Sequence, residues 1–126
     1  MTITVAAYIF LSLIGIVIIF QFCLIAGLPW GAASMGGKYP DKYPPKMRVV
    51  AFINILILSF IASIVAAKAN LFLTEITPFA QKAIWGVVAF FVLSTILNTI
   101  TPSKIERIWA PVALFALITS IIVALG

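Results

Sequence analysis

The residue types that carry out most enzyme chemistry are scarce in this chain. It has no His, a single Cys, and three acidic residues, Asp41, Glu75 and Glu106. Acid–base and nucleophilic catalysis need a His, a buried carboxylate or a perturbed Lys, and we expect all three acids to lie in loops. The chain has too few ligands for a metal site and no phosphate-binding or dinucleotide-binding motif. The sequence therefore favours a protein without enzyme activity and predicts no metal and no cofactor.

Uncharged polar residues inside apolar segments are a second group that could do chemistry. These residues are Gln21, Asn54, Ser94 and Asn98. In lipid, amide and hydroxyl groups need hydrogen-bond partners, so we expect them to face the interior of a helical bundle. The sequence leaves two roles open. Either these groups hold the helices together, or they line a polar path or pocket for a solute.

The composition indicates what kind of element must position these residues. Of the 126 residues, 64% are hydrophobic and 9% are charged, whereas soluble domains are about 45–50% apolar and about 25% charged. A chain of this length could bury only about two thirds of its surface by folding in water. Lipid must therefore cover the remaining apolar side chains.

Four continuous apolar segments cover most of the chain: residues 3–28, 49–67, 84–100 and 109–125. Each has at least the roughly 17 residues that a helix needs to cross a bilayer, and none has a polar face. Backbone amides in lipid are satisfied only in helices or closed barrels, and the alternating pattern of barrel strands is missing. The sequence predicts an all-α integral membrane bundle of four transmembrane helices with short loops, forming a single domain over residues 1–126.

The basic residues predict an orientation for this bundle. Six fall in loops one and three and two flank loop two: Lys38, Lys42, Lys46, Arg48, Lys104 and Arg107 against Lys68 and Lys82. Because loops rich in Lys and Arg stay in the cytoplasm, we expect both termini on the extracytoplasmic side of a bacterial inner membrane. This topology also accounts for the net charge of +5 without a nucleic-acid partner.

The first loop, over residues 29–48, is rich in Gly, Pro, aromatic and basic residues. Its candidate surface residues are Trp30, Lys38, Tyr39, Lys42, Tyr43, Lys46 and Arg48. Basic residues beside a membrane attract anionic lipid headgroups by about 1 kcal/mol each, so this loop is a candidate lipid-binding surface. The alternative is a basic turn that only sets the topology.

Motifs in and around the loops resemble those of a known group of proteins. They are Gly27-Leu-Pro-Trp-Gly31, Gly36-Gly37, Pro45 to Arg48, and Asn98 to Arg107 with the following Pro111-Val112. They resemble small bacterial four-helix membrane proteins that have no assigned activity. The resemblance implies a four-helix fold in a bacterial inner membrane. It also points to Glu106 and Arg107 at the entrance of the last helix, where the helix dipole favours an acid.

Small residues at helical spacing lead to the first functional hypothesis. They are Ala51, Ser59, Ala62, Ser63 and Ala66 in the second segment, and Ala116, Ser120 and Ala124 in the fourth. Such stripes let helices approach closely. The leading hypothesis is a non-enzymatic module that packs against itself or other membrane proteins, as an accessory, regulatory or immunity-type subunit.

Two further hypotheses rest on the other residue groups. The polar residues within the spans suggest a homo-oligomeric carrier or channel for a small solute. The first loop suggests a lipid-binding or lipid-modifying protein. The expected partners are membrane lipids and a second copy of this chain or another membrane protein.

Overall fold

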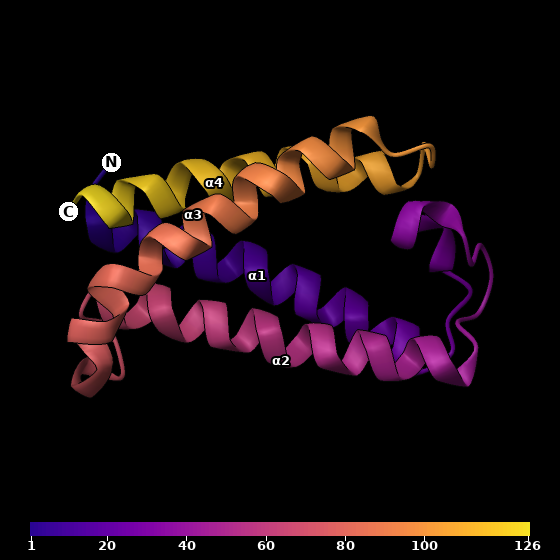
Figure 1. Cartoon of the computed structure of the whole chain (residues 1–126), viewed down its shortest axis with the longest axis horizontal. Helices are drawn as coiled ribbons and strands as arrows, with labels where there is room; N and C mark the ends of the chain where they lie inside the picture. Colours follow the sequence, from indigo (N-terminus) through magenta and orange to yellow (C-terminus); the bar gives the residue numbers. More distant parts are fainter.

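The computed structural model describes all 126 residues and contains helices, loops and short 3₁₀ turns. The long helices are α1 (Ile3–Ile25), α2 (Pro45–Lys68), α3 (Thr77–Ile100) and α4 (Trp109–Leu125). The 3₁₀ turns are η1 (Gly31–Ala33), η2 (Met35–Gly37), η3 (Thr74–Ile76) and η4 (Glu106–Ile108). Consecutive helices run in opposite directions, so both termini lie at one end of the bundle (Figure 1). Four helices are long and apolar enough to cross a membrane, which confirms the predicted all-α class.

Three helix ends differ by three or more residues from the predicted ones, because hydropathy alone does not mark helix caps. Helix α1 stops at Ile25 instead of 28, and Gly27 then turns the chain with a φ of +92°, which glycine adopts readily. Helix α2 begins at Pro45 instead of 49, since proline fits a first turn whose N–H groups have no helical partner. Helix α3 begins at Thr77 instead of 84, with Pro78 in its first turn.

The main core lies in the half of the bundle that holds the termini and the second loop. All four helices contribute to it: Ala6, Ala7, Phe10, Ile14, Leu58, Ile61, Ile64, Val65, Ala67, Ala80, Ile84, Val87, Phe91, Ala116 and Val123. The rings of Phe10 and Phe91 meet edge to face with centroids 5.3 Å apart, a favoured aromatic geometry. Lys68 Nζ donates to the carbonyl of Val123 at 3.1 Å and so caps the end of α4. This half of the bundle is closed.

In the other half, the hairpin α1–α2 diverges from the hairpin α3–α4 (Figure 1). A smaller buried cluster, Leu24, Tyr43, Met47 and Ala51, joins α1, α2 and the first loop, and it contains no residue of α3 or α4. The first loop spans the distance between the two hairpins at this end (Figure 1). The divergence leaves space between the four helices.

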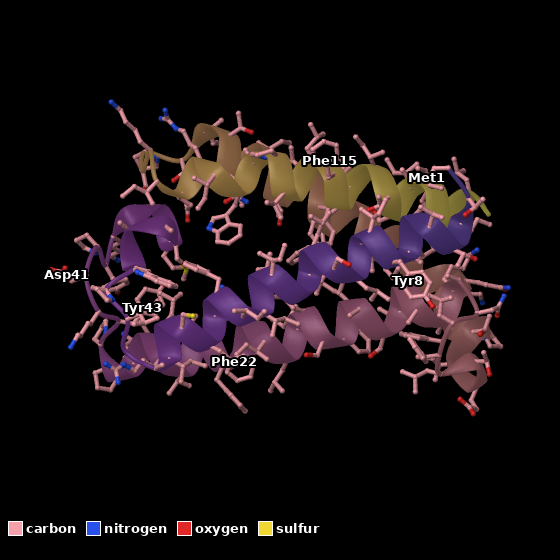
Figure 2. The ribbon with its side chains drawn as sticks, turned by 180° about the vertical axis from the view of Figure 1, so that it is seen from behind. Met1, Tyr8, Phe22, Asp41, Tyr43 and Phe115 are labelled. Atoms are coloured by element: carbon pink, nitrogen blue, oxygen red, sulfur yellow. The ribbon has the colours of Figure 1, made fainter.

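The outside of the bundle is covered by large apolar side chains. Phe22 and Phe115, for example, point away from the helices (Figure 2) and are 54% and 57% exposed. Exposed apolar surface on this scale needs an apolar environment. The exterior therefore agrees with the membrane-length helices.

The small-residue stripes are mostly used inside the chain. Ala51, Ala66, Ala116 and Ser120 are buried among the chain's own helices, whereas Ser59 is exposed. Small side chains at these positions let the four helices pack closely. The stripes are thus explained by the bundle itself, which weakens the reason for assigning them to a partner protein.

Candidate ligand pocket

A cavity of about 620 Å³ lies between the two hairpins in the half where they diverge. Most of its lining is apolar, from residues on all four helices and on the first and third loops. Its polar lining residues are Gln21, Ser34, Asn54, Ser94, Asn98, Thr101 and Glu106. Small-molecule sites in proteins are typically about 300–1,000 Å³, largely apolar and marked by a few polar groups. The cavity has the size and composition of such a site.

All four polar residues singled out within the apolar segments line this one cavity. Gln21 comes from α1, Asn54 from α2, and Ser94 and Asn98 from α3. None of their side chains forms a hydrogen bond to another helix, and the Asn98 amide donates to the carbonyl of Ser94 in its own helix at 2.7 Å. The structure thus places these four residues around the same cavity.

Gln21 carries the one buried side-chain polar atom of the chain that has no hydrogen-bond partner. Its side chain is only 8% exposed, and its Oε1 atom has no hydrogen-bond partner. A buried polar group without a partner costs about 1–3 kcal/mol. Such groups are rare in folded proteins, so an unsatisfied acceptor in a cavity wall marks a place where a donor from a ligand can bind.

Glu106 lies at the loop end of the cavity and connects the two loops. The backbone N–H of Gly36 donates to both carboxylate oxygens, at 3.2 Å to Oε1 and 3.1 Å to Oε2. Gly36 has a φ of +67°, a conformation that costs a residue with a Cβ about 1–2 kcal/mol. The double glycine of the first loop thus allows a backbone N–H to face the acid.

Two further hydrogen bonds hold the first loop against the third loop and α4. Trp109 Nε1 donates to the carbonyl of Ala33 at 2.9 Å, and the hydroxyl of Ser103 donates to the carbonyl of Ala32. The Trp109 ring also packs on Phe20 of α1, with centroids 4.9 Å apart. These contacts join the diverging hairpins and cover the cavity at the loop end.

Arg107, the other residue expected at the helix entrance, does not line the cavity. Its Nε donates to the carbonyl of Thr101 at 3.1 Å. No Lys or Arg nitrogen lies within 4.0 Å of the Glu106 carboxylate. The protein itself therefore leaves the Glu106 carboxylate without a cationic partner.

The candidate residues of the first loop lie outside the cavity. Tyr43 is buried at the loop end of the bundle (Figure 2), and its hydroxyl donates to Ser34 Oγ at 2.7 Å. Burial raises the pKa of Tyr43 above its ordinary value of 10.0; the Ser34 hydrogen bond lowers it and the nearby Glu106 charge raises it further. Arg48 Nε donates to the Tyr43 carbonyl at 2.9 Å. Both residues stabilise the loop.

Among the remaining loop candidates, Tyr39 is half-buried and packs against the small cluster around Tyr43, whereas Lys38 is exposed. Lys38 Nζ lies 5.8 Å from the centroid of the Tyr39 ring, within reach of a cation–π interaction. Trp30, Lys42 and Lys46 are exposed. These positions are compatible with contact to headgroups, but they form no enclosed site.

The sequence pointed to Glu106 but gave no reason to place other loop residues at the same site. Ser34, Gly36 and Thr101 line it, although they are distant in sequence from the polar residues of α1 and α2. Trp109 was expected only at a helix end. The Gly36-Gly37 pair was the available signal, because adjacent glycines permit close backbone approach.

The structure thus defines a four-helix bundle of membrane-length helices with a cavity between the two hairpins in one half, which is open to the outside along the exposed residues Ile57, Leu97 and Ile100. No protein-family model, curated protein or solved structure matches this chain. The resemblance to small bacterial four-helix membrane proteins therefore stays a prediction.

Proposed function

We propose that this protein is a membrane-embedded binding protein whose cavity takes a small amphipathic molecule. The observation that carries the proposal is the buried, unpartnered Oε1 of Gln21 in the wall of a cavity of about 620 Å³. Of the hypotheses that the sequence left open, solute binding within the bundle uses Gln21, Asn54, Ser94 and Asn98 together. Apolar walls would hold the body of the molecule, and these polar groups would orient it.

The closed half of the bundle bears on whether such a molecule could pass through the protein or would only bind in it. The main core fills the space between the helices on the side of the termini, so the cavity does not continue through the bundle. This arrangement favours a bound molecule over a continuous channel. It is also compatible with a carrier that opens to one side at a time.

We also propose a location and an orientation. Six of the eight basic residues lie at or beside the first and third loops, which supports placing that end, and the cavity with it, toward the cytoplasm of a bacterial inner membrane. Both termini would then be extracytoplasmic. Association with another copy or another membrane protein stays a prediction from the sequence.

Binding can be tested by filling the cavity. We expect the wild-type protein, in discs of phosphatidylcholine, to retain one molecule of at least one dodecyl probe from dodecanol, dodecylamine and dodecanoate. Mass spectrometry of the intact complex measures the retained probe. Ser94→Phe places a ring in the cavity and should weaken binding at least about tenfold.

The matched control is Thr99→Phe, which adds the same ring to an exposed position of the same helix. It should bind the probes as the wild type does. Equal binding by the wild type and Ser94→Phe, or no binding of any probe, would contradict the proposed function.

A further inference from the structure

The chemistry of the cavity wall narrows the class of ligand, given the proposed function on which this inference rests. Glu106 is the only charged residue among those that line the cavity. Basic residues that could balance it, such as Arg107 and Lys38, are absent from the lining. An anion entering the cavity would meet a negative charge and no cation, so the wall disfavours it.

The hydrogen-bonding groups of the wall also favour a ligand that carries N–H donors. The Oε1 of Gln21 has no partner, and Asn98 uses its amide nitrogen within its own helix, which leaves its oxygen as an acceptor. The donors of Trp109 and Gly36 are already used by the Ala33 carbonyl and the Glu106 carboxylate. The oxygens of Gln21, Asn98 and Glu106 can therefore accept hydrogen bonds from a ligand that carries N–H donors. The amide N–H groups of Gln21 and Asn54 are free as well.

An ammonium group fits both conditions. It carries a positive charge, three N–H donors and no acceptor. A carboxylate that accepts from one backbone N–H retains lone pairs for further donors. Electrostatic attraction between the two charges is stronger in a water-poor site than in water.

The apolar part of the wall indicates what the ammonium is attached to. The rings of Phe20, Phe90, Phe91 and Trp109 line the cavity with aliphatic residues. Aromatic faces accept both hydrocarbon and cations. The ligand therefore combines a cationic head with an apolar body.

We propose that the cavity is a binding site for an alkyl or acyl chain bearing an ammonium group, with the ammonium held by the Glu106 carboxylate. Two sources supply this chemistry: the headgroup of an ethanolamine lipid, and a free amphipathic amine. Both would present the same N–H donors to Glu106 and to the free oxygens of Gln21 and Asn98.

The test compares three dodecyl probes that differ only in their head: dodecylamine, dodecanol and dodecanoate. The full-length protein is placed in discs of phosphatidylcholine, which has no N–H donor, and probe binding is measured by mass spectrometry of the intact complex. We expect dodecylamine to bind at least about tenfold more tightly than dodecanol, and dodecanoate to bind most weakly.

Substitutions of acidic residues then identify the side chain that selects the amine. Glu106→Gln should abolish the preference for dodecylamine over dodecanol while dodecanol still binds, because a glutamine oxygen can still accept the Gly36 N–H. Glu106→Asp keeps the charge and should retain the preference. Glu75→Gln removes an exposed acid at the second loop and controls for amine partitioning into the disc.

A second set of discs contains phosphatidylethanolamine. Retention of this lipid by the wild type, and its displacement by dodecylamine, would identify the headgroup as the source. Selective binding of dodecylamine without lipid retention would identify a free amine.

Failure of this inference is distinguishable from failure of the proposed function. If the wild type binds the three probes equally and Ser94→Phe still weakens them all, the cavity binds ligands but does not select an ammonium, which overturns the inference. A preference for dodecylamine that survives Glu106→Gln would overturn it as well. If Ser94→Phe has no effect on any probe, both proposals fall.

Discussion

Among single residues, Gln21 distinguishes the cavity wall, because its side-chain oxygen forms no hydrogen bond within the folded chain. Gln21 lies on a helix that is otherwise apolar at that level, and its Oε1 is buried without a partner. Replacement of such a group by an apolar side chain of similar size removes a desolvation cost. We therefore expect the Gln21 side chain to lower the stability of the ligand-free protein while it contributes to ligand binding.

We predict that Gln21→Leu stabilises the ligand-free protein by about 1–3 kcal/mol. Unfolding by dodecyl sulfate, followed by circular dichroism, measures the change. The control is Gln81→Leu at an exposed position of α3, which should change stability by less than about 0.5 kcal/mol. Destabilisation by Gln21→Leu would mean that the amide has a partner within the protein.

At the scale of elements, the first loop acts as a cover whose shape depends on its glycines. The N–H of Gly31 donates to the carbonyl of Asp41 at 3.1 Å. A Cβ at Gly31 would overlap the carbonyl oxygens of Tyr39 and Asp41. The loop therefore folds back on itself at Gly31 before it reaches Glu106, and this fold presents the Gly36 N–H to the acid.

We predict that Gly31→Ala releases the first loop from the third loop and leaves the four helices intact. Hydrogen exchange at the Gly36 amide and limited proteolysis within residues 31–44 should both increase. The overpacked turn should lower the free energy of unfolding by about 1–3 kcal/mol. Gly86→Ala, at a helical glycine with open space around it, is the control and should leave loop exchange unchanged. Unchanged exchange in Gly31→Ala would show that the cover does not depend on this close approach.

At the scale of the whole molecule, the two halves of the bundle differ in packing and in charge. One half is filled by the main core and holds the termini, with Lys68 and Lys82 near its end. The other contains the cavity, the two basic loops and Glu106. This asymmetry favours a fixed orientation in a membrane.

We predict that both termini face the extracytoplasmic side. Reporter fusions that are active only outside the cytoplasm should be active at the termini and at the second loop, and inactive in the first loop. Replacement of Lys38, Lys42 and Lys46 by glutamine should reduce this bias, because the basic excess of the loop end would fall. Termini found in the cytoplasm would reverse the orientation and place the cavity in the outer half of the membrane.

Much of the architecture could be predicted from hydropathy and helix length. The four helices follow from apolar runs of membrane length, since lipid leaves the backbone no other way to satisfy its amides in such segments. The starts at Pro45 and Thr77 escaped this reasoning, because proline and basic residues in a first turn lower hydropathy without ending a helix.

Local composition and periodicity predict the all-α class and the four membrane-length helices, and the structure contains both. Packing between the hairpins places Gln21, Asn54, Ser94 and Asn98 around one cavity, leaves Gln21 Oε1 without a partner and brings Glu106 to Gly36. These relations depend on how far the two hairpins diverge. That divergence is set by packing between helices distant in sequence, which no local pattern encodes.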